Sequence, residues 1–280
     1  MQAQEASVTL PALQRMKREG RKIVGVVAWD YPMAQIVDRA GVEIVSVGDS
    51  VGINLWGQPS PLEVTMDEML VVCKAVRRGV KRALVSVDFP FGPLQEGVDA
   101  ALRAAIRFVK EAGADMIKLD GAADFPDTVR AIVRAGIPVF AQLGITPQTA
   151  LQLGIDYKQM LKTGARLAPE ASAKLLDQAK RLEDAGASLL DFTHSGPVAG
   201  PVVVSGVAIP VLGGLGGGPW LDGRMRMAHA AIGYAAAQLD APSDTYANVA
   251  QISLDAITAY AQDVRAGRQI KGGIAIKPVV

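Results

Sequence analysis

Short apolar runs alternate along this chain with longer amphipathic stretches. Four of the amphipathic stretches end in Ala-Gly, and an apolar run follows each pair within a few residues. The pairs are Ala40-Gly41, Ala112-Gly113, Ala135-Gly136 and Ala185-Gly186. A glycine just after a helix adopts the left-handed conformation that ends many helices. Helices and strands joined in this way by short loops predict βαβ units and a parallel sheet.

Seven of the apolar runs are predicted strands, and their number and spacing indicate a barrel. The expected strands are residues 23–29, 44–48, 83–87, 116–119, 138–143, 189–192 and 210–212. An eighth strand is expected near residues 230–238, or as an irregular segment, because no pattern places it. Seven or eight βα units over about 250 residues favour a (β/α)8 TIM barrel over a doubly wound sheet.

The amphipathic stretches between these runs are predicted helices, among them residues 96–112 and 168–185. In the second, Pro169 lies in the first turn and Glu170 lies near the start, and both favour a helix N-terminus. Residues 8–20 predict an N-terminal helix across the barrel floor, and residues 254–268 predict a C-terminal helix. Because no low-complexity linker divides the chain, we expect a single domain over residues 1–280.

Composition narrows the class of protein. The 29 basic and 28 acidic residues balance, so the charge gives no indication of nucleic acid or an anionic membrane as a partner. The apolar runs are far shorter than a bilayer span needs, and the polar N-terminus does not resemble a signal peptide. Cys73 is the only cysteine, which excludes an intramolecular disulfide, and its apolar neighbours predict a core position. We therefore expect a cytoplasmic protein.

Acidic residues stand at the ends of three predicted strands. Asp49, Asp88 and Asp120 follow or end the second, third and fourth strands, and Lys118 lies two residues before Asp120. Active residues of a parallel barrel lie at the carboxyl ends of its strands. Each aspartate taken singly could cap the next helix, but three carboxylates in one pocket repel one another unless a cation neutralises them. Oxygen ligands suit Mg²⁺, so the sequence predicts a magnesium site held by Asp49, Asp88 and Asp120.

A glycine cluster, Gly213 to Gly218, follows the seventh predicted strand. Backbone N–H groups in this part of a barrel can bind an anion, although a flexible loop explains the cluster equally well. The cluster contains no lysine, so it is not a P-loop.

Several short motifs occur together in an order that resembles one enzyme family. They are Val47-Gly48-Asp49-Ser50-Val51-Gly52, Gly57, Val64-Thr65, Ala75-Val76-Arg77-Arg78-Gly79, Asp88-Phe89-Pro90-Phe91, Ala112-Gly113-Ala114, Lys118-Leu119-Asp120-Gly121 and Leu143-Gly144-Ile145-Thr146-Pro147-Gln148. Their order and spacing from about residue 10 to 148 resemble the ketopantoate (3-methyl-2-oxobutanoate) hydroxymethyltransferase family of the phosphoenolpyruvate/pyruvate barrel superfamily. From 185 to 224 the resemblance is looser, with Ile209-Pro210-Val211 and Asp222-Gly223.

The resemblance implies a reaction and a set of site residues. Family members bind Mg²⁺ at the positions of Asp49, Asp88 and Asp120, the last of which is usually a glutamate. A 2-oxo acid chelates the metal, and residues matching Ser50 and Lys118, with Asp88 and Gln142 beside them, bind this substrate. The metal stabilises the enolate formed when C3 loses a proton, and methylenetetrahydrofolate supplies the one-carbon unit. The family forms large homo-oligomers, so we expect a homo-oligomer. The resemblance also implies a role in pantothenate biosynthesis.

Two positions depart from the family. Gln142 stands where the family carries a histidine, and Thr193 stands where it carries the glutamate base. Thr193 cannot remove a proton near neutral pH, so we expect a substitute nearby. Asp191 points to the same side of its strand as Thr193, ~7 Å lower. His194 is basic near pH 7, and we predict that it faces the pocket and acts as the base, with Asp191 and Lys118 as further catalytic candidates.

Three interpretations remain open on sequence alone. The first is the family reaction, and the second is a divergent aldolase or lyase acting on another 2-oxo acid, as the changes at Gln142 and Thr193 suggest. The third is a catalytically silent paralogue that binds a ligand, against which the retained acids and Lys118 argue. His229, in a predicted helical stretch over residues 224–231, is assigned to packing.

Overall fold

The computed structural model describes residues 6–154 and 171–272 of the chain. The chain falls into two compact units, Met1–Met227 and Ala228–Val280, which are described in turn. The single-domain organisation expected from the sequence stays a prediction.

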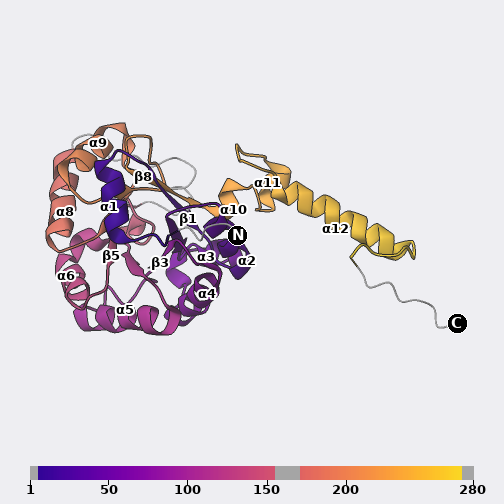
Figure 1. Ribbon diagram of the computed structural model, residues 1–280, viewed down its shortest axis with the longest axis horizontal. Helices are drawn as coiled ribbons and strands as arrows, with labels where there is room; N and C mark the ends of the chain where they lie inside the picture. The colour runs from indigo at the N-terminus through magenta and orange to yellow at the C-terminus, as the bar shows by residue number, and fades with distance from the viewer. Residues whose placement is uncertain (1–5, 155–170, 273–280) are drawn as a thin grey trace. The chain divides into compact units, whose positions relative to one another are not determined.

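Parallel strands form the centre of the first unit, with helices around them (Figure 1). The strands among the described residues are β1 (Ile23–Val27), β2 (Ile44–Val47), β3 (Leu84–Asp88), β4 (Met116–Leu119), β5 (Val139–Gly144), β6 (Leu189–Thr193), β7 (Val211–Leu212) and β8 (Gly223–Met227). They pair in the order β7-β6-β5-β4-β3-β2-β1-β8. A hydrogen bond joins the two ends of this order, because the N–H of Met225 in β8 donates to the carbonyl of Gly213, just beyond β7, at 3.2 Å. The sheet is therefore a nearly closed barrel, and the predicted (β/α)8 fold class is confirmed.

The eighth strand lies earlier in the chain than expected. The prediction near residues 230–238 is wrong, because β8 is Gly223–Met227 and pairs with β1 in register, Met225 opposite Gly25. The predicted helix over residues 224–231 is likewise wrong for its first half. In β8 the exposed Arg224 and Arg226 alternate with Met225, which is buried. Such a strand is no apolar run, so the pattern that found the other strands did not find this one.

Helices follow the strands, and side chains cap the N-termini of two of them. They are α2 (Tyr31–Arg39), α3 (Val51–Leu55), α4 (Met66–Gly79), α5 (Val98–Ala112), α6 (Pro126–Arg134), α8 (Ser172–Asp184) and α9 (Gly196–Gly206). The Asp30 carboxylate accepts from the Met33 N–H at 2.8 Å, and Thr65 and Glu68 form a reciprocal capping box on α4. Gly113 ends α5 at φ 70°, as its Ala-Gly pair predicted. Pro169 and Glu170, the predicted start signals of α8, lie outside the described residues.

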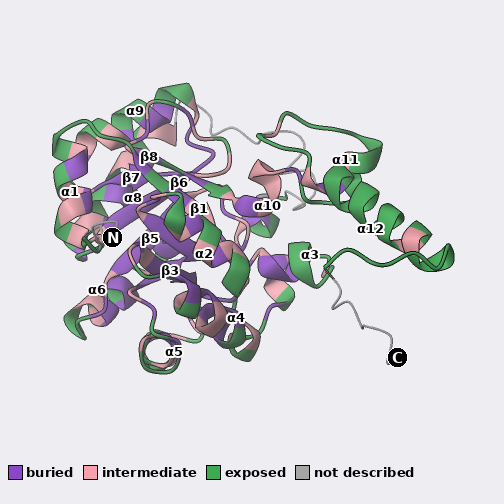
Figure 2. Cartoon of the chain, turned by 45° about the vertical axis from the view of Figure 1, so that its right-hand side comes forward, coloured by how far each residue is buried: buried purple, intermediate pink, exposed green. Residues whose placement is uncertain are grey.

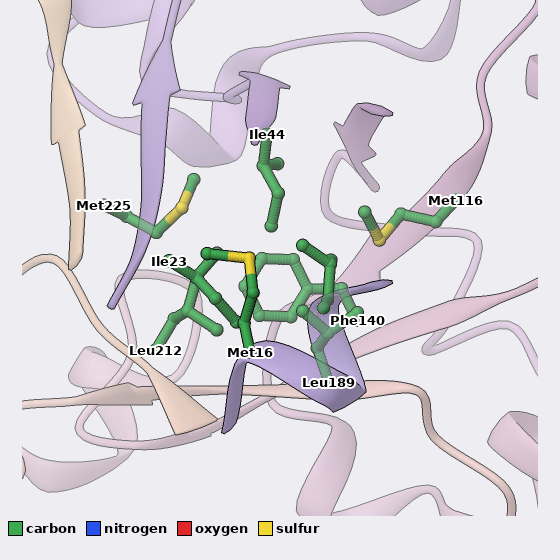
Figure 3. Packing of buried hydrophobic residues seen from close by; sticks show 9 residues of the cluster. Met16, Ile23, Ile44, Met116, Phe140, Leu189, Leu212 and Met225 are labelled. Atoms are coloured by element: carbon green, nitrogen blue, oxygen red, sulfur yellow. The ribbon is translucent and has the colours of Figure 1, made fainter. Parts of the chain in front are cut away.

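An apolar cluster closes the amino-terminal end of the barrel (Figure 3). Most of its strand residues open their strands, and the whole set is Ile23, Ile44, Met116, Phe140, Leu189, Leu212 and Met225. Leu13 and Met16 of α1 (Leu10–Arg18) belong to the same cluster, so the N-terminal helix covers the floor as expected. Burial of these side chains leaves only the carboxyl ends of the strands for polar chemistry. Figure 2 shows the strands buried and the outer sides of the helices exposed.

The second unit consists of short helices and one long helix, α10 (Ala228–Ala231), α11 (Ala237–Asp240) and α12 (Val249–Arg265). Hydrogen bonds from Tyr246 N to Ala231 O and from Val249 N to Ile232 O, both within the unit, hold its turns together. The His229 ring packs edge-on against Tyr234, with ring centroids 4.8 Å apart, which agrees with a packing role. None of the helices in the described part of the chain is long and apolar enough to cross a membrane.

Candidate active site

Because side chains alternate between the two faces of each strand, a layer of polar side chains lies above the apolar floor. Met116, Phe140 and Leu189 belong to the floor, and residues two positions further along each strand point to the same side. In β4, β5 and β6 these residues are Lys118, Gln142 and Asp191, and in β3 the corresponding face carries Ser86 and Asp88. All of them are buried, so the carboxyl end of the barrel encloses charged and hydrogen-bonding groups.

Lys118 joins two carboxylates inside the barrel. Its Nζ atom lies 3.2 Å from Oδ2 of Asp88 and 3.2 Å from Oδ2 of Asp191, which comes from a strand two places away. Burial works against the charged ammonium, but the surrounding carboxylates, Asp88 and Asp191 first, outweigh it and raise the pKa of Lys118. Lys118 is therefore a fixed positive charge shared between two acids.

Gln148, in the loop after β5, links the other two acids. Its side-chain Nε2 donates to Asp49 Oδ2 and to the carbonyl of Phe89, both at 2.9 Å. Its backbone N–H donates to Asp120 Oδ2 at 3.0 Å. No role was predicted for Gln148, and its only signal in the sequence is its place at the end of the Leu143–Gln148 motif.

The three predicted acids lie near one another at the ends of β2, β3 and β4. Burial, followed by the charges of Asp88 and Asp120, raises the pKa of Asp49 to about 7. Burial also raises the pKa of Asp88, and it raises that of Asp120 to about 6, although the neighbouring Thr146 side chain and the Gln148 N–H act in the opposite direction. Carboxylates that disfavour each other's charge in this way form a site that a cation would stabilise.

The chemistry of these oxygen donors fits a hard divalent cation, although the three acids are not arranged as a ready metal-binding group. Among the described residues, no three His, Cys, Asp or Glu side chains are arranged to hold a metal ion. One oxygen of each carboxylate is instead held by Lys118 or Gln148. The second oxygens of Asp88 and Asp120 are buried with no hydrogen-bond partner in the described part of the chain. A buried acceptor without a donor costs folding free energy, and Mg²⁺ prefers oxygen ligands. These two carboxylate oxygens are therefore suitable ligands for such a cation.

The two positions that depart from the family touch each other. Gln142 Nε2 donates to Thr193 Oγ1 at 2.8 Å, within the buried interior. Both side chains are uncharged, so this pair supplies no group that takes up a proton near neutral pH.

The two remaining predicted residues lie just beyond strand ends. His194 follows β6 with a left-handed φ of 57°, and its backbone N–H donates to the Leu215 carbonyl at 2.6 Å. The buried ring lies against the glycine-rich loop, since a Cβ added to Gly216 would stand 2.8 Å from its Nδ1. Ser50 follows Asp49 at the N-cap position of α3 and is half-buried. The roles of both residues stay predictions.

The glycine-rich loop itself is fastened to β8. The Arg224 guanidinium donates to the carbonyls of Gly213 and Gly214 at 3.1 and 3.2 Å. These contacts explain the placement of the loop, and anion binding there stays untested.

The chain as a whole is similar to a known protein family. The family model described as "Ketopantoate hydroxymethyltransferase" matches residues 7–269. A 3-methyl-2-oxobutanoate hydroxymethyltransferase from Cyanothece sp. (strain PCC 7425 / ATCC 29141) is 39% identical over 261 residues, 92% of this chain and 96% of the relative. A protein of the same name from Moorella thermoacetica (strain ATCC 39073 / JCM 9320) is 39% identical over 269 residues, 95% of this chain and 96% of the relative.

Solved structures resemble the fold at low sequence identity. Phosphonopyruvate hydrolase, in a complex with oxalate and Mg²⁺, gives a TM-score of 0.57 at 15% identity and covers 97% of this chain and 92% of its own. 2,3-Dimethylmalate lyase, a PEP mutase/isocitrate lyase superfamily member, gives a TM-score of 0.57 at 15% identity and covers 95% of this chain and 98% of its own. These structures support the barrel alone. The sequence matches show that the chain belongs to the ketopantoate hydroxymethyltransferase family, as its motifs predicted.

Proposed function

We propose that this protein transfers a hydroxymethyl group from methylenetetrahydrofolate to C3 of 3-methyl-2-oxobutanoate with Mg²⁺ as its metal, a step of pantothenate biosynthesis. One observation carries the proposal. A chain that matches this family over residues 7–269 keeps Asp49, Asp88, Asp120 and Lys118 in one buried group at the carboxyl ends of its strands.

The acids would hold the metal and the lysine would orient the substrate. The unpartnered oxygens of Asp88 and Asp120 are the first candidates for ligands, and Asp49 can join them directly or through water. A divalent cation bound there would polarise the keto oxygen of a 2-oxo acid and make the C3 proton more acidic. Lys118, held between Asp88 and Asp191, places a positive charge where the carboxylate of the substrate would bind.

The other residues shape and close the site. Ser50 and Gln142 are candidates for hydrogen bonds to the substrate, and the apolar floor keeps water from the interior beneath them. The reaction also needs a proton acceptor within reach of C3. His194 and Asp191, both at the end of β6, are the candidates. A homo-oligomer and a cytoplasmic location stay predictions.

A second candidate function is an aldolase or lyase reaction on a different 2-oxo acid. The uncharged Gln142–Thr193 pair favours it, because these positions hold no group for acid–base work. The third interpretation, a silent ligand-binding paralogue, would leave a buried group of acids without a use.

Mg²⁺-dependent exchange of the C3 proton of 3-methyl-2-oxobutanoate into D₂O separates the three. The family reaction requires this exchange, the divergent enzyme performs it on another substrate, and the silent paralogue performs none. The metal itself is tested by melting. Asp88→Ala should abolish the stabilisation that Mg²⁺ and a 2-oxo acid together give the wild-type protein, since binding to the native state raises stability. Asp127→Ala, at an exposed aspartate of α6, is the control and should keep it.

A further inference from the structure

The proposed reaction lacks an assigned proton acceptor. Thr193 and Gln142 bond to each other and carry no charge. His194 lies beyond the strand, where its left-handed backbone, its bond to Leu215 and its contact with Gly216 place it on the side of the glycine-rich loop. The inner face of β6 therefore offers one other titratable group, Asp191.

Asp191 is built into the interior of the barrel. It lies two residues beyond Leu189 of the floor and opposite Gln142 in the β5–β6 ladder, and its side chain is 7% exposed. Its Oδ2 atom is 3.2 Å from the Lys118 ammonium. Its Oδ1 atom is buried and has no hydrogen-bond partner in the described part of the chain. One oxygen is thus anchored, while the other is an acceptor to which none of the described residues presents a donor.

A buried acceptor of this kind costs folding free energy unless a water molecule or a bound ligand donates a hydrogen bond to it. Water could satisfy it in the resting protein, and a bound substrate would displace that water. Lys118 is already shared with Asp88, so a single ammonium faces two carboxylates. Asp191 can accept a proton without leaving Lys118 unpaired, because Asp88 remains beside the ammonium.

We propose that Oδ1 of Asp191 removes the C3 proton of the 2-oxo acid while Oδ2 stays paired with Lys118. The proposal rests on the proposed function. In this step the C3–H bond breaks and an O–H bond forms on Asp191. The electron pair moves into the C2–C3 bond, and the keto oxygen gains the negative charge. In D₂O the proton on Asp191 exchanges with solvent, and return of the step delivers a deuteron to C3.

The test follows C3 exchange of 3-methyl-2-oxobutanoate in D₂O by proton NMR, with Mg²⁺ present and folate absent. Asp191→Asn keeps the shape and a carbonyl oxygen for Lys118 but cannot take up a proton. We expect its exchange rate to fall ~10²–10⁴-fold, the range for loss of a general base. Its melting shift with Mg²⁺ and 3-methyl-2-oxobutanoate should match that of the wild type, which shows that the variant folds and binds. Asp127→Asn, at the exposed aspartate, is the matched control.

Two further variants separate proton transfer from a positioning role. Asp191→Glu retains the carboxylate and should exchange well above Asp191→Asn, so a Glu variant as slow as the Asn variant would contradict the proposal. In a Lys118→Met background, Asp191→Asn should still lower the rate further, whereas a residue acting only through Lys118 would add nothing. If Asp191→Asn fails to fold, the Glu variant and His194→Gln decide the question.

C3 exchange that survives in Asp191→Asn and is lost in His194→Gln would overturn the proposal, because it would show that the histidine removes the C3 proton. A wild-type protein that exchanges no deuterium would instead count against the proposed function, and the Asp191 assignment would fall with it.

Discussion

Stability of the metal-free protein should fall as pH rises, and Asp49→Asn should remove the part of this dependence that Asp49 contributes. In the native protein Asp49 is buried beside Asp88 and Asp120, and these surroundings raise its pKa from 3.8 to about 7. The replacing amide cannot ionise, yet its oxygen can still accept the hydrogen bond from Gln148. The variant therefore tests the charge and not the contact.

The sign and size of the effect follow from proton linkage. Between pH 4 and 7 the unfolded chain has lost the Asp49 proton while the native protein keeps it, so stability decreases across this window. Because one pKa unit corresponds to 1.36 kcal/mol, the rise to about 7 corresponds to at most about 4 kcal/mol. Asp120, whose pKa is raised to about 6, adds to the loss in the same direction.

Urea unfolding in EDTA at pH 5 and pH 8 measures the effect. We expect the wild type to be clearly less stable at pH 8, and Asp49→Asn to be more stable than the wild type there by about 2–4 kcal/mol. Added Mg²⁺ should restore the wild type at pH 8 and help the variant less. Asp127→Asn should follow the wild type. An Asp49→Asn protein with the wild-type pH slope would refute the assignment of a buried, mutually repelling cluster.

Two further predictions concern the barrel that supports the site. Phe140→Ala in the floor should lower the free energy of unfolding by about 3–5 kcal/mol, because Phe140 is fully buried. Phe91→Ala, at a side chain 44% exposed, should cost far less. Equal losses for the two variants in urea unfolding would contradict the assignment of Phe140 to a packed barrel floor. Gly144→Ala should destabilise the protein more than Gly136→Ala, because both glycines have positive φ but only at Gly144 would the new methyl meet a backbone carbonyl, that of Thr193. Thermal melting of the two alanine variants checks this, and equal losses would show that the contact is harmless.

The fold was predictable where a local pattern decides it. Seven strands were placed within about two residues, because a buried parallel strand is a continuous apolar run. The eighth, Gly223–Met227, escaped because its outward arginines interrupt that pattern. The acids were found for a related reason, since strands that run in parallel bring their carboxyl ends to one edge.

The rest of the site depends on contacts that no local pattern contains. Gln148 reaches Asp49 and Asp120 from a loop, beyond the left-handed turn at Gly144. Lys118 reaches Asp191 across an intervening strand, which needs the curvature of the nearly closed barrel and a long side chain together. Strand parity predicted that Asp191 points inward. Only the structure shows that Lys118 anchors one of its oxygens and that the other has no hydrogen-bond partner among the described residues.

Transfer of a labelled carbon tests the central proposal most directly. The purified protein would be incubated with 3-methyl-2-oxobutanoate, Mg²⁺ and methylenetetrahydrofolate carrying ¹³C in its methylene group. We expect a ¹³C-labelled hydroxymethyl group bonded to C3 of the oxo acid. It should form with Mg²⁺ and should be absent in EDTA and absent in Asp88→Ala. Catalysed C3 exchange without any labelled product would contradict the hydroxymethyl transfer and favour a divergent reaction at the same site.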